Sequence, residues 1–170
     1  MPNIKKEFSK VYDKYIEKIY RFVYFKVGSV EIAEDLSSET FLKYWNYYKK
    51  SIDPEENYEE IDNSQAFLYQ IARNLIADHY RKEGRTRIVS TDDFVIPDDE
   101  DIHAKAKLDS DLANVRFALN KLKDDYQNAI IWHYLDDLPV KEVAKLLNKS
   151  ENNTRVMLHR ALKELKRNID

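Results

Sequence analysis

The sequence predicts an all-α protein in which two small helical domains are joined by an acidic linker. Apolar residues recur at three- and four-residue intervals over most of the chain, which is the spacing of amphipathic helices. Two glycines and four prolines among 170 residues leave few positions for tight hairpins. Helical periodicity lapses between residues 84 and 111, where eight carboxylates gather. We therefore expect domains at residues 1–86 and 112–170, with the linker at 87–111.

Three helices are expected in the N-terminal domain. Gly28 and Ser29 separate the first helix from the second, because glycine favours helix ends and serine favours helix starts. Residues 51–62 form a polar acidic loop, in which Pro54 prevents helix continuation. The apolar periodicity places the helices over residues 5–27, 30–49 and 64–82.

The first helix carries a wide apolar stripe, which we interpret as core. The stripe consists of Phe8, Val11, Tyr12, Tyr15, Ile16, Ile19, Tyr20, Phe22 and Val23. On the second helix, Leu42 and Trp45 stand three residues apart on an otherwise polar face that includes Asp35, Ser38 and Glu39. Exposed apolar groups on a polar face are typical of a partner-binding patch.

The third helix has a core side and a mixed side. The core side is predicted to hold Phe67, Leu68, Ile71, Ala72, Leu75 and Ile76. The mixed side carries Tyr69, Gln70, Arg73, Asn74, Asp78, Tyr80 and Arg81. Aromatic rings interleaved with basic and amide groups suit single-stranded nucleic acid, since bases stack on rings and cations follow phosphates. Tyrosines half-buried at a helix edge are the ordinary alternative.

The C-terminal domain is predicted to present a helix-turn-helix. Helices starting near residues 112 and 126 form its base, the second with Ala129, Ile130, Ile131, Tyr134 and Leu135 as apolar residues. Residues 139–167 then read as helix, tight turn, helix. Asn148 suits a turn position with positive φ, and Ser150 suits the N-cap of the last helix.

The last helix has a polar face that suits DNA. Basic residues outnumber acidic ones eight to four over residues 139–170, although the whole chain has a net charge of -3. The first turns present Asn152, Asn153 and Arg155, whose amides and guanidinium can pair with adenine and guanine in the major groove. A solvated helix pair with mixed charges is the alternative for this segment.

Several classes of protein are disfavoured. The chain has no cysteine, and its four histidines show no metal-ligand spacing. Catalytic and nucleotide-binding motifs are missing, so we expect neither an enzyme nor a cofactor. No apolar run approaches the length that crosses a bilayer, and the N-terminus does not read as a secretion signal. These features favour a cytoplasmic protein without membrane insertion.

Three stretches, in this order, resemble the extracytoplasmic-function (ECF) subfamily of bacterial RNA polymerase sigma factors. EDLSSETFLKYW at 34–45 resembles the region-two helix that binds the polymerase clamp. FLYQIARNLIADHYRKEGR at 67–85 resembles the promoter-melting helix. Residues 119–167 resemble the region-four domain. The resemblance implies a sigma factor that binds core polymerase and promoter DNA, both duplex and single-stranded, with an anti-sigma factor as a further partner to consider.

The resemblance also implies roles for residues. Core polymerase would be bound by Asp35, Ser38, Glu39, Leu42 and Trp45, with Phe41 at or beneath that surface. The minus-ten element would meet Asn63, Ser64 and Gln65, which capture a flipped base, and Asn74, His79, Tyr80 and Arg81, which follow the opened strand. The minus-thirty-five element would meet Ser150, Asn152, Asn153, Arg155 and Arg160.

Two other functions fit the same sequence. A stand-alone helix-turn-helix regulator would bind DNA without core polymerase, using its N-terminal helices for sensing or dimerisation. A helical adaptor would bind only another protein. The basic C-terminal segment and its amide-rich helix face argue against the adaptor.

Overall fold

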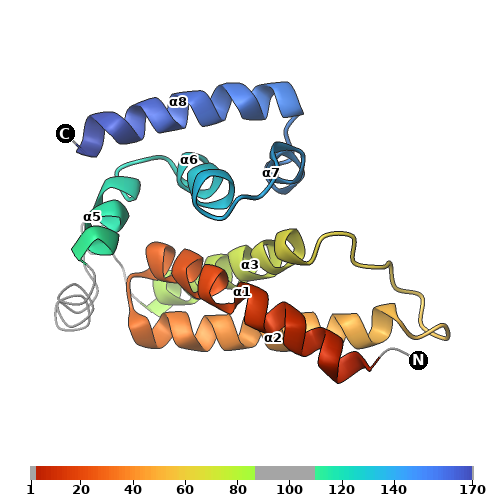
Figure 1. The fold of residues 1–170 in the computed structure, drawn as a ribbon. Coiled ribbons are helices and arrows are strands. Elements are labelled where there is room, and N and C mark those ends of the chain that lie inside the picture. Colours follow the sequence, from red (N-terminus) through yellow and green to blue (C-terminus); the bar gives the residue numbers. More distant parts are fainter. Residues whose placement is uncertain (1–2, 87–109, 170) are drawn as a thin grey trace. The chain divides into compact units, whose positions relative to one another are not determined.

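The computed structural model describes residues 3–86 and 110–169, which form two compact units (Figure 1). All regular elements in these two stretches are helices, as the sequence predicts. The acidic linker expected at 87–111 lies outside the described residues except for its last two positions, which belong to a helix. Within the described stretches no helix combines the length and apolarity needed to cross a membrane.

The N-terminal unit is a bundle of α1 (Ile4–Val27), α2 (Val30–Ser51) and α3 (Ser64–Thr86), in which each helix packs against the other two. Local signals set the boundary between the first two helices. Gly28 has φ 72° and its N–H donates to the Tyr24 carbonyl, while the Ser29 Oγ accepts from the Ile32 N–H at 3.2 Å. One helix therefore ends and the next begins within two residues.

Only part of the apolar stripe predicted on α1 is buried in the core of this unit. On α1 the buried residues begin at Ile19. Tyr12 is 40% exposed, so its prediction as a core residue is wrong. The other stripe residues outside the core are only half-buried, namely Phe8, Val11, Tyr15, Ile16 and Tyr20. The N-terminal half of α1 is left partly uncovered by the other helices, and its apolar groups line a groove instead.

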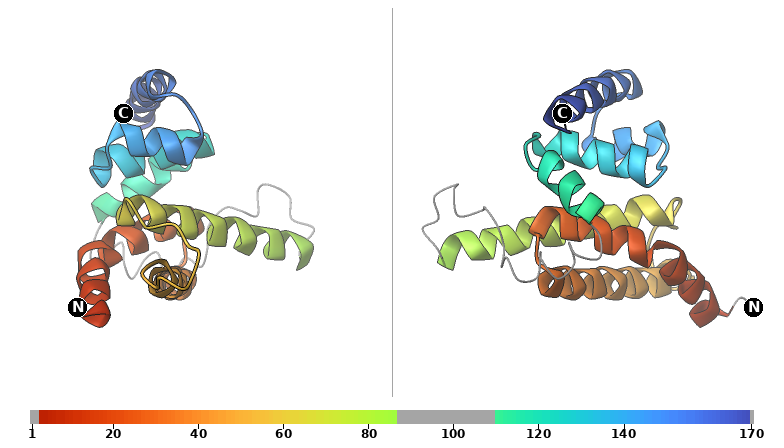
Figure 2. Two further views of the ribbon diagram at one scale, coloured as in Figure 1. Left: turned by 90° about the vertical axis from the view of Figure 1, so that its right-hand side faces the viewer. Right: turned by 60° about the vertical axis from the view of Figure 1, so that its left-hand side comes forward.

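Tyr69 is a second correction. It was predicted on the mixed side of α3, but its side chain is fully buried and its ring meets Phe22 edge-on at 5.5 Å. Because α3 packs on both α1 and α2, its buried arc is wider than a single stripe. Tyr69 is therefore a core residue. The C-terminal part of α3 projects beyond α1 and α2 (Figure 2).

The C-terminal unit consists of α5 (Ser110–Leu119), α6 (Asp124–Ala129), the π-helix η2 (Ile130–Leu135), α7 (Val140–Leu147) and α8 (Glu151–Ile169). The long α8 packs against the other four helices (Figure 1). Its buried residues are Thr154, Leu158, Ala161 and Leu165, which leaves the opposite side of the helix exposed.

The π-helix changes which residues point inward. Ordinary helical periodicity placed Tyr134 and Leu135 among the apolar residues of the domain's base, but they are 42% and 38% exposed. Trp132 is fully buried instead. The Asp136 N–H donates to the Ile131 carbonyl at 3.0 Å, a bond that spans five residues and widens the turn. The hydrogen-bonded ring holds one residue more than in an α-helix, so the side chains that follow are rotated from the positions that α-helical spacing predicts.

Candidate nucleic-acid and polymerase interfaces

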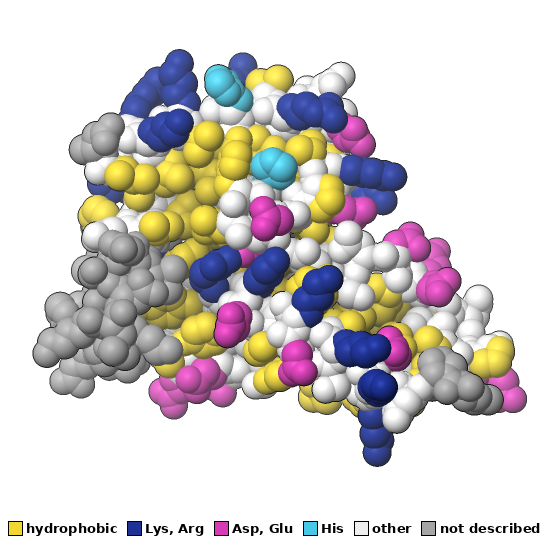
Figure 3. Space-filling view, in the orientation of Figure 1, with side chains coloured by type: hydrophobic (Ala, Val, Ile, Leu, Met, Phe, Trp, Pro, Cys, Tyr) yellow, Lys and Arg dark blue, Asp and Glu magenta, His cyan; other side chains and the backbone are white. Residues whose placement is uncertain are grey.

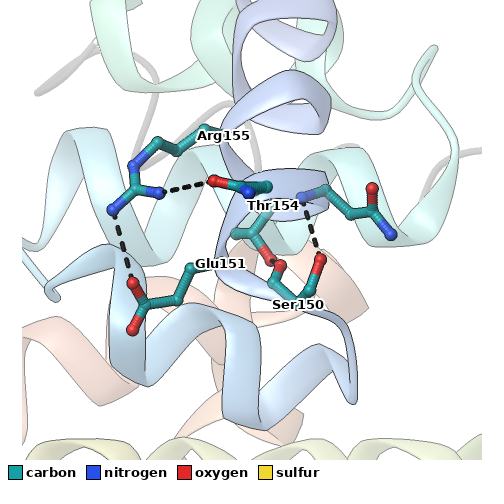
Figure 4. A network of polar contacts seen from close by, with 6 residues as sticks. Ser150, Glu151, Thr154 and Arg155 are labelled. Atoms are coloured by element: carbon teal, nitrogen blue, oxygen red, sulfur yellow. Dashed lines mark hydrogen bonds and ion pairs between the residues drawn. The ribbon is translucent and has the colours of Figure 1, made fainter.

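The turn between α7 and α8 is held by local hydrogen bonds. Asn148 adopts the left-handed conformation at φ 56°, as its position in the sequence predicted. The Ser150 Oγ accepts from the Asn153 N–H at 3.1 Å and so caps α8 (Figure 4). The buried Thr154 hydroxyl donates to the Ser150 carbonyl at 2.8 Å. These local bonds fix the residue at which α8 begins.

The first two turns of α8 expose the predicted DNA-reading groups. Asn152, Asn153 and Arg155 are all exposed. The guanidinium of Arg155 donates to the Asn152 Oδ1 at 3.2 Å and contacts the Glu151 carboxylate at 3.4 Å (Figure 4). An exposed pair of this kind is worth at most about 1 kcal/mol, so a phosphate or a guanine could replace it at little cost.

A row of side chains runs along this helix face. Arg160 follows Asn153 by seven residues, so helical geometry places both in one row. Val156 stands between them and is 48% exposed. An apolar group beside amides and an arginine is suited to a thymine methyl group. Sequence reasoning did not select Val156, although its spacing from Asn153 and Arg160 was readable.

The predicted polymerase face on α2 is larger than the sequence indicated. Asp35, Ser38, Glu39 and Leu42 are exposed, and Leu42 has 57% of its surface accessible. The apolar part of this face is a groove of about 280 Å³, which we call the α1–α2 groove. It is lined by Phe8, Tyr12, Ser38, Phe41, Leu42 and Trp45.

Aromatic contacts build the walls of the α1–α2 groove. The rings of Phe8 and Trp45 lie 4.9 Å apart, as do those of Tyr12 and Phe41. The groove therefore joins α2 to the uncovered half of α1. Phe8 and Tyr12 were missed as surface residues because their spacing on α1 is also that of a core stripe.

The residues predicted to capture a flipped base lie together at the start of α3. The Asn63 Oδ1 accepts from the Ala66 N–H at 2.9 Å. The Ser64 Oγ lies 2.9 Å from the Tyr44 hydroxyl, and the Gln65 amide donates to the Tyr69 hydroxyl at 3.3 Å. Asn63, Ser64 and Gln65 also line one open pocket with the N-terminal half of α1.

The other residues predicted for the minus-ten element lie farther along α3. Asn74 is exposed, and Arg81 forms an ion pair with Asp78 at 2.8 Å on the surface. His79 and Tyr80 are half-buried. The Tyr80 hydroxyl donates to the Lys26 carbonyl, so this group ties α3 to the end of α1. Tyr80 therefore makes a structural contact within the unit, whereas Asn74 and Arg81 are exposed.

Side chains that could hold a metal ion were looked for in the described part of the chain. Over residues 3–86 and 110–169, no group of three or more histidine, aspartate and glutamate side chains could hold a metal ion. The residues that the sequence predicted for recognition lie on α8, on α2 and on α3 from its start onward.

Comparisons with known families assign both units. Residues 11–86 match Sigma-70 region 2, and residues 112–165 match Sigma-70 region 4. The two matched segments are separated by 87–111, the stretch predicted as linker.

Known proteins of similar sequence are sigma factors. The chain is 31% identical over 163 residues to the ECF RNA polymerase sigma factor BldN of Streptomyces coelicolor, covering 94% of this chain and 59% of that protein. It is 28% identical over 176 residues to the ECF RNA polymerase sigma factor SigX of Bacillus subtilis, covering 98% of this chain and 86% of SigX.

Solved structures share the fold. The sigma factor RpoE of Bartonella quintana, in complex with the anti-sigma factor NepR, gives a TM-score of 0.67 at 19% identity, covering 96% of this chain and 97% of that one. CnrH, in complex with the cytosolic domain of CnrY, gives 0.67 at 18% identity, covering 95% and 86%. The matches to Sigma-70 regions 2 and 4, in that order along the chain, and the similar sequences agree on one assignment. The chain belongs to the ECF subfamily of bacterial RNA polymerase sigma factors, which direct transcription initiation.

Proposed function

We propose that this chain binds core RNA polymerase and starts transcription at promoters that it selects itself. In this proposal the N-terminal unit holds the polymerase and separates the strands at the minus-ten element, while the C-terminal unit reads the minus-thirty-five duplex. The observation that carries the proposal is the exposed Asn152, Asn153 and Arg155 face on α8, in a chain that also matches Sigma-70 region 2.

The polymerase-binding surface is proposed to be the α1–α2 groove with its acidic neighbours. Leu42 and Trp45 supply apolar area, and Asp35 and Glu39 supply charge for orientation. An apolar centre with a polar rim is the usual construction of a protein interface. Ser38 lies in the lining of the groove and adds a hydroxyl to that centre.

Strand separation is proposed to use the start and the exposed face of α3. Asn63, Ser64 and Gln65 would hold a base taken out of the stack, and Asn74, His79, Tyr80 and Arg81 would follow the strand. Nucleic acid would meet Ser150, Asn152, Asn153, Arg155 and Arg160 in the C-terminal unit. The chain itself would catalyse nothing and need no cofactor, since nucleotide addition is the work of the polymerase, and it would act in the cytoplasm.

The experiment is co-purification with core RNA polymerase, followed by transcription from a promoter library. Core plus this chain should bind each other and start at a defined set of sites, whereas core alone should not. A stand-alone regulator would instead shift a palindromic duplex as a dimer and fail to co-purify with core. Absence of core binding would overturn the proposal.

An anti-sigma factor is proposed as a regulator of this chain. The two structural relatives are both recorded in complex with an anti-sigma partner or the cytosolic domain of a second protein. Such an inhibitor would have to cover the α1–α2 groove or the α8 face. Its effect would be visible as loss of core binding when the inhibitor is added.

A further inference from the structure

The guanidinium of Arg155 is held by two neighbours on the first turn of α8. Its Nη1 donates to the Asn152 Oδ1 at 3.2 Å, and its Nη2 lies 3.4 Å from the Glu151 Oε2 (Figure 4). Asn152 and Glu151 precede Arg155 by three and four residues, so the three side chains meet on one side of the helix. Asn152 and Arg155 are proposed above to meet DNA, whereas Glu151 has no role in that proposal.

Both contacts draw the Arg155 side chain back over the start of α8. Side chains on a helix lean toward its N-terminus, and a glutamate four residues before a basic residue is the favourable order for an ion pair. In a helix-turn-helix, the first residues of the second helix are those that contact base edges. Arg155 is thus held beside the part of α8 that would enter the major groove.

The held guanidinium keeps donors for a base. Each terminal nitrogen of an arginine carries a pair of N–H groups, and Asn152 and Glu151 engage only one on each nitrogen. Guanine presents its O6 and N7 as acceptors in the major groove. Arg155 can therefore donate to a guanine without releasing either neighbour.

The Glu151 carboxylate disfavours a phosphate at the same place. A phosphate bound to this guanidinium would lie close to the carboxylate, and two negative charges at short range repel each other. The side chains of Arg155 and Glu151 are 57% and 48% exposed, so water screens this repulsion in the free chain but less so once DNA covers them. Guanine is uncharged and meets no such repulsion. Glu151 therefore favours a base over a phosphate as the partner of Arg155.

Arg160 provides the contrast on the same helix. It is exposed and forms no ion pair with any residue in the two described stretches. Residues 151–155 contain one acidic and one basic residue, whereas residues 156–167 contain four basic residues and one acidic residue. In Figure 3, magenta side chains lie beside dark blue ones around the start of α8, at the upper right. The start of α8 is thus electrically neutral, and its excess of basic charge begins with Arg160.

We propose that Glu151 is a positioning residue that decides what Arg155 recognises. It holds the guanidinium for a guanine of the upstream element and keeps it from the phosphates, while Arg160 contacts a phosphate. Glu151 thus lowers the affinity for DNA of any sequence and raises the preference for the correct element. This inference rests on the proposed function, and it adds a specificity-determining residue that acts through another side chain.

The first test compares two promoter duplexes that differ only in the upstream element, one with the selected sequence and one with a shuffled sequence. The full chain is used in complex with core polymerase. Glu151→Gln should tighten binding to the shuffled duplex, so that the preference falls by about tenfold, which is within the discrimination of one arginine–guanine pair. The slope of log K against log salt on the shuffled duplex should become steeper by about 0.9, the value for one further phosphate.

Asp125→Asn is the matched control for the loss of charge. Asp125 is exposed in the first turn of α6 and is not one of the residues that hold Arg155. Its substitution removes one negative charge from the first turn of a helix in the same unit, as Glu151→Gln does. The preference and the salt slope should both stay as in the wild type. Equal changes in the two variants would show that Glu151 acts only through net charge and would overturn the proposal.

The second test asks whether Glu151 acts through Arg155. Arg155→Ala should lower the preference, and adding Glu151→Gln to it should cause no further loss, because the side chain that Glu151 positions is absent. Arg160→Ala should instead weaken binding to both duplexes alike and make the salt slope shallower by about 0.9. Additive losses from Glu151→Gln and Arg155→Ala would contradict the role of Glu151.

The third test identifies the base. Replacing the guanines of the selected element by 7-deazaguanine removes the N7 acceptor and should weaken binding of the wild type by about tenfold. The same replacement should have little effect on Arg155→Ala. A selected element without guanine, or equal losses in the wild type and Arg155→Ala, contradicts the assignment of guanine.

Core binding separates this inference from the proposed function. A wild-type chain that does not bind core ends the proposed function and the inference with it. A wild-type chain that binds core and initiates at defined sites, with Glu151→Gln behaving as Asp125→Asn does, ends only the inference. The double variant keeps the test decisive if Glu151→Gln lowers the melting temperature, because a loss of helix stability would not depend on Arg155.

Discussion

The hydroxyl oxygens of Tyr44 and Ser64 lie 2.9 Å apart and join the middle of α2 to the first residue of α3. Tyr44 is 2% exposed, and its ring contacts Phe8 at 6.2 Å and Phe67 at 5.9 Å. The helix that carries the proposed polymerase face is thereby linked to the turn proposed to hold an extruded base. The two proposed sites therefore share this partly buried contact.

Tyr44 makes the stability of the N-terminal unit sensitive to alkaline pH. Burial raises the pKa of Tyr44 above its ordinary 10.0, although the Ser64 hydrogen bond lowers that pKa in part. The folded state therefore disfavours the phenolate, and this stability is fully present below pH 10 and is lost as the pH rises through the raised pKa. We expect the free energy of unfolding to fall above about pH 10 and Tyr44→Phe to reduce that fall.

Urea unfolding at a series of alkaline pH values measures this effect. Tyr134→Phe is the control, because Tyr134 is 42% exposed and belongs to the other unit. An unchanged pH profile in Tyr44→Phe would show that other groups cause the alkaline loss. At neutral pH, removing the hydroxyl should cost about 1 kcal/mol, the usual net value of one hydrogen bond.

Arg155→Ala should weaken binding to the upstream duplex. The loss should be about 1 to 3 kcal/mol if Arg155 reads a guanine, or the salt slope should become shallower by about 0.9 if it contacts a phosphate. Fluorescence anisotropy with promoter duplexes at several salt concentrations distinguishes the two. Arg167→Ala, an exposed arginine near the end of the same helix, is the control. No change in affinity or slope would remove Arg155 from the interface.

Val156 should read a thymine methyl group. Its exposed position between Asn153 and Arg160 predicts that replacing one thymine of the upstream element by uracil weakens binding to the wild type. Val156→Ala should weaken binding by about 1 kcal/mol and should no longer distinguish thymine from uracil. If Val156→Ala discriminates as the wild type does, the methyl group is recognised elsewhere.

Leu42→Asp should impair binding to core polymerase. Leu42 is 57% exposed in the α1–α2 groove, so an aspartate can be solvated in the free chain but not in an apolar interface. We expect at least a tenfold loss, about 1.4 kcal/mol, in binding to immobilised core. Ile169→Asp alters a residue that is 61% exposed in the other unit and should bind normally. Equal affinities would place the polymerase on another surface.

Asn148 tests the turn of the helix-turn-helix. Its φ of 56° lies in the left-handed region, which is unfavourable for most residues that carry a β-carbon. Asn148→Ala should therefore destabilise the C-terminal unit by about 1 kcal/mol, whereas Asn148→Gly should be tolerated. The background Trp45→Phe leaves Trp132, buried in this unit, as the one tryptophan reporter in denaturant unfolding. Equal midpoints for the alanine and glycine variants would show that the turn is not strained.

The sequence by itself determined that the chain is helical and where two of the helix boundaries lie, between α1 and α2 and between α7 and α8. Gly28 with Ser29, and Asn148 with Ser150, act through backbone conformation and hydrogen bonds to residues at most four positions away. Such signals can be read without knowledge of the fold. The exposed amide and arginine face of α8 was predictable for the same reason, since residues on one side of a helix are set by spacing alone. The roles of the proposed site residues stay predictions for the experiments above.

Only the tertiary structure decided which apolar stripes are covered. Spacing identifies a face of a helix but not the helix that packs on it, so Tyr69 proved buried and Tyr12 exposed. In the π-helix at Ile130–Leu135, Trp132 is buried while Tyr134 and Leu135 are exposed. The hydrogen bond over five residues that shapes this helix cannot be predicted from apolar periodicity. The open pocket beside Asn63 joins Lys10 and Lys14 of α1 to Asp62, about fifty positions away in sequence. Packing alone brings such distant groups together, because no local hydrogen bond or spacing connects them.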